Sequence, residues 1–266
     1  MRQIVTGLVM TSTPLNPNPS VGYDCWSTLY DLLYERAYGD QYHHMTESHL
    51  ALLDNFAGKV LDIGAGTGRI AVPLAQRGRT ITAVEPSSGM LQQLNAKAIR
   101  AGVASRIHQV CRCLEDVSDT DGVASDHGVA ICVFSTIHHL LEVDVLARAF
   151  ARVAKSLHKG GVAIIGVHPP EVFQGFRNGI EREVSLPEFG GNFVWHQIAK
   201  PTSDRPEILD TQCKVIFPDG RVVVDNLTTR PWTLADIRRA ALGSGLVEQE
   251  SLERVGPEDL MRFCKP

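Results

Sequence analysis

The chain has 266 residues, with 26 Lys and Arg against 30 Asp and Glu, so its formal charge is −4 and its pI is about 6.2. With 44% apolar residues it has the composition of a globular protein that is long enough to bury a full core. It contains no run of ~18 apolar residues that could cross a membrane. A slightly acidic chain without a Lys/Arg cluster is also a poor candidate for nucleic-acid binding, so we expect neither membrane nor nucleic acid as its main partner.

The cysteines and the amino terminus restrict the cellular setting. Six scattered cysteines are too few for a disulfide scaffold. Cys111 and Cys113 would share one face of a strand, but no second Cys or His pair completes a zinc spacing, so we expect no metal. Residues 4–10 form an apolar run that is short and interrupted for a signal peptide. We expect a cytoplasmic protein whose residues 1–20 are irregular, because three prolines there prevent regular structure.

Two helices are predicted first, and strands alternate with helices after them. Apolar residues at helical spacing predict helices over 26–37 and 46–56, within an amino-terminal lid of about 21–57. From there, short apolar runs predict strands at 59–63, 80–84, 106–111, 129–134 and 162–167. One predicted helix follows the glycine turn and ends at residue 77, and two more cover 88–101 and 143–157. This alternation is typical of βαβ units with a parallel sheet and right-handed crossovers.

The last third of the chain has a different pattern. Strands are predicted at 193–199, 212–217 and 221–227, then a helix at 234–242 and strands at 246–252 and 261–264. Residues 218–220 form a Pro-Asp-Gly turn, which favours an antiparallel hairpin between the flanking strands. We therefore interpret residues 21–266 as a single domain, in which a cap insertion (about 168–231) covers the carboxyl end of the sheet.

A glycine-rich turn is the most informative segment. Gly64, Gly66 and Gly68 follow Asp62 between a predicted strand and a predicted helix. Glycines let a ligand approach the backbone amides, and the helix amino end suits an anionic group. Glu85 ends the next strand, 21 residues after Gly64, where a carboxylate can accept both hydroxyls of a ribose. The pattern predicts a nucleoside cofactor site at the carboxyl edge of the sheet.

The glycine spacing argues against two common cofactors. The dinucleotide fingerprint requires its third glycine at position 69, which is Arg69 in this chain. No Gly-Lys-Ser/Thr follows the turn, so the phosphate-binding loop of nucleoside triphosphatases is absent as well. A nicotinamide oxidoreductase is therefore a weaker alternative.

Residues 60–68 (VLDIGAGTG) and 83–86 (AVEP) resemble motifs I and II of the class I S-adenosylmethionine-dependent methyltransferases. The resemblance extends to residues 134–140 (FSTIHHL) and 157–161 (LHKGG), and covers roughly residues 22–264. It implies an α/β fold: a Rossmann-like, seven-stranded, mostly parallel sheet with a closing antiparallel hairpin and an antiparallel cap insertion. It also implies S-adenosyl-L-methionine as the cofactor.

The resemblance implies roles for individual residues of the cofactor site. Asp62, Gly64, Ala65 and Gly66 would bind the methionine part, and Glu85 would hold the ribose. The remaining residues follow from the same resemblance: Pro86 and Met90 would flank the adenine, Leu114 would approach it, Phe134 and Ser135 would line the methionine end, and Tyr23 would close over the cofactor.

The adenine end departs from the family pattern. Members often have Asp where Cys113 stands, and Cys is a weak acceptor. Either Glu115 or Asp116 takes over this role, or adenine recognition is mostly apolar.

Methyl transfer requires alignment of a nucleophile and a deprotonated acceptor atom, and histidine has a pKa suited to accept that proton. His138 and His139 follow the fourth strand and His168 follows the fifth, at the edge where the sulfur of the cofactor is expected. Adjacent side chains point in different directions, so we favour His139 as the catalytic base, with His138 second and His168 as a third candidate.

Three functions compete at this stage. The first is methyl transfer to an O, N or C nucleophile of a small molecule in secondary metabolism. The second is a non-methylating cyclisation or pericyclic step, and the third is cofactor binding without catalysis. Aromatic residues of the cap can wall an apolar substrate pocket, namely Phe173, Phe176, Phe189, Phe193 and Trp195. The cap strands could also pair between the two subunits of a homodimer.

Overall fold

The computed structural model describes residues 23–123, 125–187 and 191–266. The expected irregular segment 1–20 and Phe189 lie outside these residues. The larger sheet has the strand order β10-β11-β5-β4-β1-β2-β3. Its strands are β1 (Lys59–Ile63), β2 (Ile81–Val84), β3 (Ile107–Val110), β4 (His127–Cys132), β5 (Leu157–Val167), β10 (Val247–Val255) and β11 (Glu258–Cys264).

The predicted seven-stranded Rossmann-like sheet is confirmed. Strands β3, β2, β1, β4 and β5 are parallel, while β11 runs antiparallel to β5 and pairs with β10 in the closing hairpin. Strands β2 and β4 are buried along their whole length, as expected of parallel strands covered on both faces. Because parallel strands share one carboxyl edge, the loops after β1, β2, β4 and β5 all meet there.

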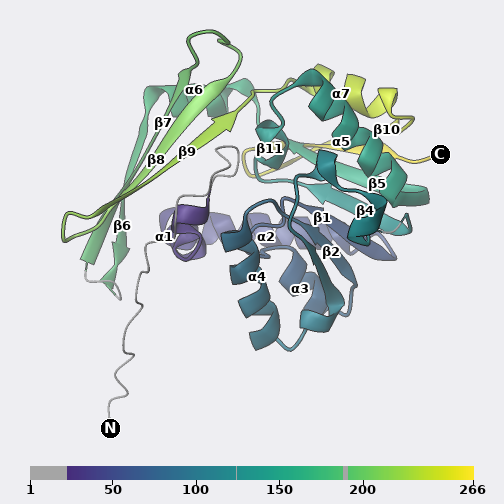
Figure 1. Ribbon diagram of the computed structural model, residues 1–266, viewed down its shortest axis with the longest axis horizontal. Coiled ribbons are helices and arrows are strands. Elements are labelled where there is room, and N and C mark those ends of the chain that lie inside the picture. The colour runs from purple at the N-terminus through teal and green to yellow at the C-terminus, as the bar shows by residue number, and fades with distance from the viewer. Residues whose placement is uncertain (1–22, 124, 188–190) are drawn as a thin grey trace.

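Helices cover both faces of this sheet (Figure 1). One face packs against α2 (Asp40–Leu53), α3 (Ala71–Gln76) and α4 (Ser88–Arg100). The other packs against α5 (Val143–Ser156) and α7 (Leu234–Gly243). The loops of the larger sheet also contain short 3-10 helices, namely η2 (Ala104–Arg106), η3 (Leu114–Asp116), η4 (Asp119–Asp121) and η5 (Thr136–His139). Among the described residues, no helix combines the length and apolarity that a bilayer span requires.

A second sheet stands beside the carboxyl edge of the first (Figure 1). It is antiparallel and contains β6 (Ile180–Leu186), β7 (Gly191–Pro201), β8 (Leu209–Ile216) and β9 (Val222–Thr229), in that order. Helix α6 (Pro170–Asn178) leads into it. Its edge strands are β6 and β9, and pairing of cap strands in a homodimer stays a prediction.

Two elements of the cap were not predicted. Helix α6 starts at Pro170, because proline is favoured in the first turn of a helix. Strand β6 exposes most of its charged residues and buries only Val184 and Leu186, so it has no continuous apolar run. It forms because β7 provides a partner along its whole length.

The amino-terminal segment joins the two sheets. It contains η1 (Asp24–Trp26) and α1 (Tyr30–Tyr38), so the predicted helix over 26–37 begins later than expected. The ring of Trp26 packs edge-on against Trp195 of β7, with centroids 5.8 Å apart. The carboxylate of Asp225 on β9 accepts hydrogen bonds from the Tyr23 N–H and, at 3.0 Å, from the Trp26 indole. The segment is therefore tied to the cap.

Candidate active site

The glycine turn between β1 and α3 is bent sharply toward the loop after β4. Gly64 has φ +69°, a conformation that side-chain-bearing residues rarely adopt, and a Cβ there would overlap the side chain of Thr136. Gly68 has φ +86°, and a Cβ on it would lie 2.9 Å from Leu94 of α4. Glycine is thus required at both positions for close packing, as well as for backbone conformation.

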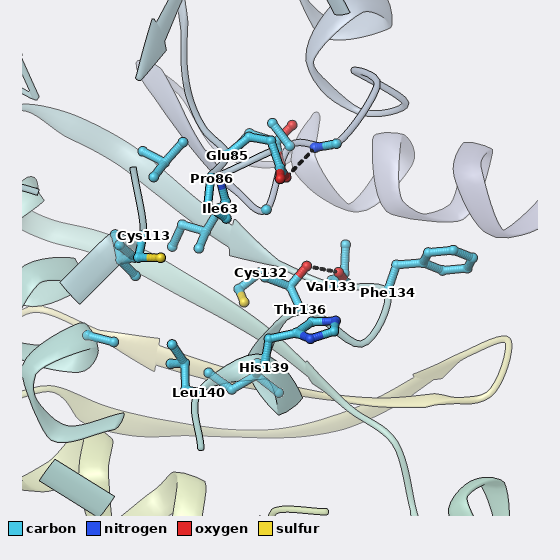
Figure 2. Close-up of a pocket in the computed structure, with 18 of the residues that line it drawn as sticks. Ile63, Glu85, Pro86, Cys113, Cys132, Val133, Phe134, Thr136, His139 and Leu140 are labelled. Atoms are coloured by element: carbon cyan, nitrogen blue, oxygen red, sulfur yellow. Dashed lines mark hydrogen bonds between the residues drawn. The ribbon is translucent and has the colours of Figure 1, made fainter. Parts of the chain in front are cut away.

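A cavity of about 440 Å³ opens above this turn. Figure 2 shows Glu85 and Pro86 across this cavity from His139 and Leu140, with Cys113 at its side. Most of the predicted cofactor residues line the cavity: Tyr23, Asp62, Gly64, Ala65, Gly66, Glu85, Pro86, Met90, Leu114 and Phe134. Residues from five separate chain segments therefore converge at one site.

Glu85 is held rigidly at the end of β2. One carboxylate oxygen accepts a hydrogen bond from the Gly66 N–H and the other from the Ser87 N–H, both at 2.9 Å. Burial raises the pKa of Glu85, and the two backbone donors partly offset this rise. The glycine turn and β2 thus orient the carboxylate, and each of its oxygens keeps one lone pair for a ligand.

Asp62 is an acid of the cavity with one oxygen unpaired within the described chain. Its Oδ2 is buried and has no hydrogen-bond partner among the described residues. Burial raises the pKa of Asp62 to about 7, although Arg69 and the Ala71 N–H act in the opposite direction. An unpaired buried carboxylate is unfavourable, so a ligand that brings a positively charged donor would stabilise it.

The adenine end contains both acids that could replace the missing Asp. Cys113 lies half-buried on the cavity wall, and its pKa is raised to about 11, first by burial. The buried Oε2 of Glu115 has no hydrogen-bond partner in the described part of the chain, whereas Asp116 is exposed. Met90 is 2% exposed, so it packs in the core of α4 and lines the cavity at the same time.

A second cavity, of about 1090 Å³, lies between the amino-terminal segment, the carboxyl edge of the larger sheet and the cap. The residues that border both cavities are Tyr23, Tyr30, Phe134 and His139. The guanidinium of Arg69 lies 4.8 Å from the centroid of the Phe134 ring, on the side of the first cavity. The two cavities therefore meet, with aromatic side chains at their junction.

The structure places His139 at this junction. Its Nδ1–H donates to the carbonyl of Thr228 at 3.3 Å, which leaves Nε2 to accept from the Tyr23 hydroxyl at 3.2 Å. Burial lowers the pKa of His139 and raises that of Tyr23, so both side chains are neutral near pH 7.

His138 does not fit the catalytic role considered for it. It is fully buried and lines neither cavity. Its Nδ1–H donates to the carbonyl of Arg230 at 2.8 Å, and its Nε2 accepts from the backbone N–H of His168 at 3.0 Å. Both ring nitrogens are therefore used in tying the start of the cap to its end, and burial lowers the pKa of His138 to about 3.

His168 and Ser135 form a pair at the second cavity. The Ser135 Oγ lies 2.7 Å from Nδ1 of His168, and both side chains line this cavity. Ser135 was expected at the methionine end of the cofactor, but it lines the second cavity and not the first. The reason is local: Phe134 and Ser135 both have positive φ, +61° and +69°, which reverses the chain after β4.

The family model of the methyltransferase domain matches residues 60–161, which run from β1 into β5. The order of the seven strands and the cavity at their carboxyl edge agree with that match. The chain thus contains a segment, residues 60–161, that matches a methyltransferase domain. A putative methyltransferase of Geobacillus sp. (strain WCH70) is 29% identical to this chain over 147 residues, 55% of this chain and 57% of that protein. The chain thus spans little more than half the length of that relative.

Solved structures extend the likeness to the cap. The CcbJ methyltransferase from Streptomyces caelestis superimposes with a TM-score of 0.72 at 20% identity, over 91% of this chain and 96% of that chain. The sugar N-methyltransferase KedS8 from Streptoalloteichus sp. ATCC 53650 gives a TM-score of 0.71 at 19% identity, over 98% of this chain and 99% of that chain. These proteins share the fold of the whole described molecule.

Proposed function

We propose that the chain transfers the methyl group of S-adenosylmethionine to an O, N or C nucleophile of a small molecule, in secondary metabolism. The observation that carries this proposal is the junction of two cavities at Tyr23, Phe134 and His139. A reaction between a bound cofactor and a second molecule needs such a junction, because the reacting atoms must be held in line and in contact.

The residues of the first cavity fit the cofactor. Asp62 would accept the ammonium of its methionine part, which supplies the missing partner of the buried Oδ2. Glu85 would accept the ribose hydroxyls with the lone pairs that Gly66 and Ser87 leave free. Pro86, Met90 and Leu114 would enclose the adenine, and the unpaired Glu115 oxygen would accept from its amino group.

When bound, the cofactor supplies a methyl group that is already activated by a sulfonium. The chain therefore has to align the acceptor, exclude water and remove a proton where the acceptor carries one. Tyr23 and Tyr30 cover the junction of the cavities, which excludes water. His139 accepts the Tyr23 hydroxyl proton in a hydrogen bond, so the Tyr23 oxygen is oriented to accept a hydrogen bond from a substrate. His139 and His168 are the proton acceptors that we propose for this site.

The likeness to a sugar N-methyltransferase supports a small-molecule substrate. The second cavity, about 1090 Å³, slightly exceeds the ~300–1,000 Å³ that small-molecule sites commonly measure, so it has room for a small molecule.

Calorimetric titration with S-adenosylmethionine and a product search together test the proposal. We expect saturable binding, and we expect that incubation with methyl-deuterated S-adenosylmethionine and small-molecule extracts yields S-adenosylhomocysteine and one labelled product. Glu85→Ala should weaken binding by about tenfold or more, because two charge-assisted hydrogen bonds are lost. A product without the label would favour the cyclisation alternative. Binding without turnover in any extract would favour a non-catalytic protein, and absence of binding would contradict the whole proposal.

A further inference from the structure

The second cavity is acidic and aromatic. Three exposed acids line it, Asp40, Glu47 and Glu171, and among the described residues neither Lys nor Arg does. Glu47 also pairs with Arg77 at 3.3 Å, so Asp40 and Glu171 contribute most of the negative charge. Four tyrosines of the amino-terminal segment form one wall: Tyr23, Tyr30, Tyr34 and Tyr38. Tyrosine rings and carboxylates attract cations, so the cavity favours a positively charged small molecule over an anionic one.

A buried carboxylate lies directly beneath the cavity. Glu258, the first residue of β11, is 1% exposed, and its Oε1 accepts from the Ser135 N–H at 2.9 Å. His168 Nε2 lies 3.7 Å from Oε1, and His49 Nε2 from α2 lies 3.9 Å from Oε2. Gly166 of β5 leaves the necessary space, because a Cβ there would come within 2.9 Å of the carboxylate. Three separate elements thus hold Glu258 in place.

Several groups around the buried Glu258 carboxyl favour its ionised form. Burial raises its pKa, but backbone donors from Ser135 and Phe134 and the charge of Arg69 lower it. Besides these groups and the two histidines, the Cys132 thiol faces Glu258 from β4. A buried negative charge needs a nearby positive charge or donor. Burial lowers the pKa of His168 to about 4, so its imidazole is a neutral donor near pH 7 and becomes a positive partner only when it accepts a proton during the reaction.

His168 connects Glu258 to the cavity. Its Nε2 is buried and makes no hydrogen bond with the described residues, and it faces the Glu258 carboxylate. The carboxylate favours the tautomer with a proton on Nε2, so Nδ1 accepts the Ser135 O–H at 2.7 Å. The lone pairs of the Ser135 oxygen are then available in the second cavity, next to Phe134 at the junction.

We propose that Ser135, His168 and Glu258 form a relay that removes a proton from the ammonium group of an amine substrate held in the second cavity. This inference rests on the proposed methyl transfer and specifies its substrate class and its proton acceptor. Ser135 and His168 are the groups that move the proton, and Glu258 is a positioning residue that acts through His168.

The relay is needed because an alkyl ammonium has a pKa of about 10, as for lysine, and carries no free lone pair near pH 7. An N–H bond of the substrate breaks and its proton passes to the Ser135 oxygen, while the Ser135 proton passes to Nδ1 of His168. The freed nitrogen lone pair forms the N–C bond as the C–S bond breaks, and that electron pair stays on the sulfur of the leaving thioether. The resulting imidazolium is paired with the Glu258 carboxylate until the proton returns to water.

Three probes of one ring size test this proposal: cyclohexylamine, cyclohexanol and 2,2-difluorocyclohexylamine, whose fluorines make the ammonium far more acidic. Calorimetry on the cofactor-free protein should show cyclohexylammonium binding about tenfold more tightly than cyclohexanol. With S-adenosylmethionine present, both amines should give S-adenosylhomocysteine and a methylated product, while the alcohol should not. Glu258→Gln should lower kcat for cyclohexylamine by about 100-fold with little change in KM. The loss should be about tenfold smaller for the fluorinated amine, which is mostly neutral at pH ~8 and needs the relay less.

Glu253→Gln is the matched control, because Glu253 lies on the same hairpin but is exposed and pairs with Arg262. It should leave both amines unaffected. Ser135→Gly is a second test that keeps Glu258 and suits the positive φ at this position, and it should reproduce the Glu258→Gln pattern. Equal losses for the two amines, preference for the alcohol, or no turnover of either amine in a protein that binds S-adenosylmethionine would each overturn the inference. Failure to bind S-adenosylmethionine would instead overturn the proposed function.

Discussion

Replacing Gly64 by Ala tests how tightly the glycine turn is packed against the loop after β4. The new Cβ adds two separate costs. The left-handed conformation at φ +69° costs about 1–2 kcal/mol for a residue with a side chain. The overlap with the side chain of Thr136 costs a further ~1–3 kcal/mol, because a packed interior accommodates extra atoms poorly. We therefore expect Gly64→Ala to lower the free energy of unfolding by about 2–5 kcal/mol.

Gly66→Ala is the matched control. Gly66 also has a positive φ, +54°, but a Cβ there would meet nothing closer than the Gly64 carbonyl at 4.0 Å. Only the conformational cost of about 1–2 kcal/mol applies.

Urea unfolding followed by circular dichroism measures both variants and the double variant Gly64→Ala, Thr136→Ala. Thr136→Ala removes the two closest atoms of the overlap, so the double variant should regain at least ~1 kcal/mol relative to the sum of the single changes. Equal destabilisation by Gly64→Ala and Gly66→Ala, together with additivity in the double variant, would refute the packing argument.

Three further predictions concern the acids and histidines of the site. Burial raises the pKa of Asp62 to about 7, so its ionisation destabilises the folded, cofactor-free protein as pH rises from about 4 to 7. Asp62→Asn should remove this pH-dependent loss in thermal melts and should weaken S-adenosylmethionine binding, and an unchanged pH dependence would argue against the raised pKa. His139→Ala should reduce turnover of a methyl acceptor at least about tenfold while cofactor affinity stays within a few-fold, whereas His138→Ala should mainly lower stability, by about 2–4 kcal/mol, since it leaves buried backbone groups unpaired. If His138→Ala instead lowered turnover and His139→Ala mainly lowered the melting temperature, the roles given to these two histidines would be wrong. Asp225→Ala removes the acceptor of two hydrogen bonds, including the one from the Trp26 indole, and should increase amide hydrogen exchange around Trp26, with the cap strands as the internal reference. Unchanged exchange there would mean that these bonds do not hold the amino-terminal segment.

Much of the cofactor site was predictable from the sequence, because the patterns that mark it involve residues that are close together in the chain. The glycine turn needs residues that tolerate positive φ, and Gly64 and Gly66 have φ +69° and +54°. Glu85 was identified from its place at the end of a short apolar strand, and β2 ends at Val84. Strand β1 has the predicted limits, since its buried apolar run ends at the first glycine of the turn.

The cap was harder to predict from its sequence. Helix α6 begins at Pro170 directly after Pro169, and β6 contains three consecutive charged residues, 181–183, without a continuous apolar run. The first pattern also occurs in loops and the second in exposed helices, so neighbouring strands decide the outcome in both cases. In this chain β7 pairs with β6 along its full length.

The sequence by itself determined the parallel sheet, the glycine turn and the carboxylate that ends the second strand, because each depends on residues within a few positions of one another. Only the tertiary structure decided where the three histidines lie and what they contact. His138 and His139 are neighbours in the chain, but one is locked between Arg230 and His168 and the other opens onto both cavities. Glu258 comes 123 residues after Ser135, and no local pattern links the two. Their contact exists because β11 inserts beside β5, and such long-range pairing depends on the packing of the whole fold.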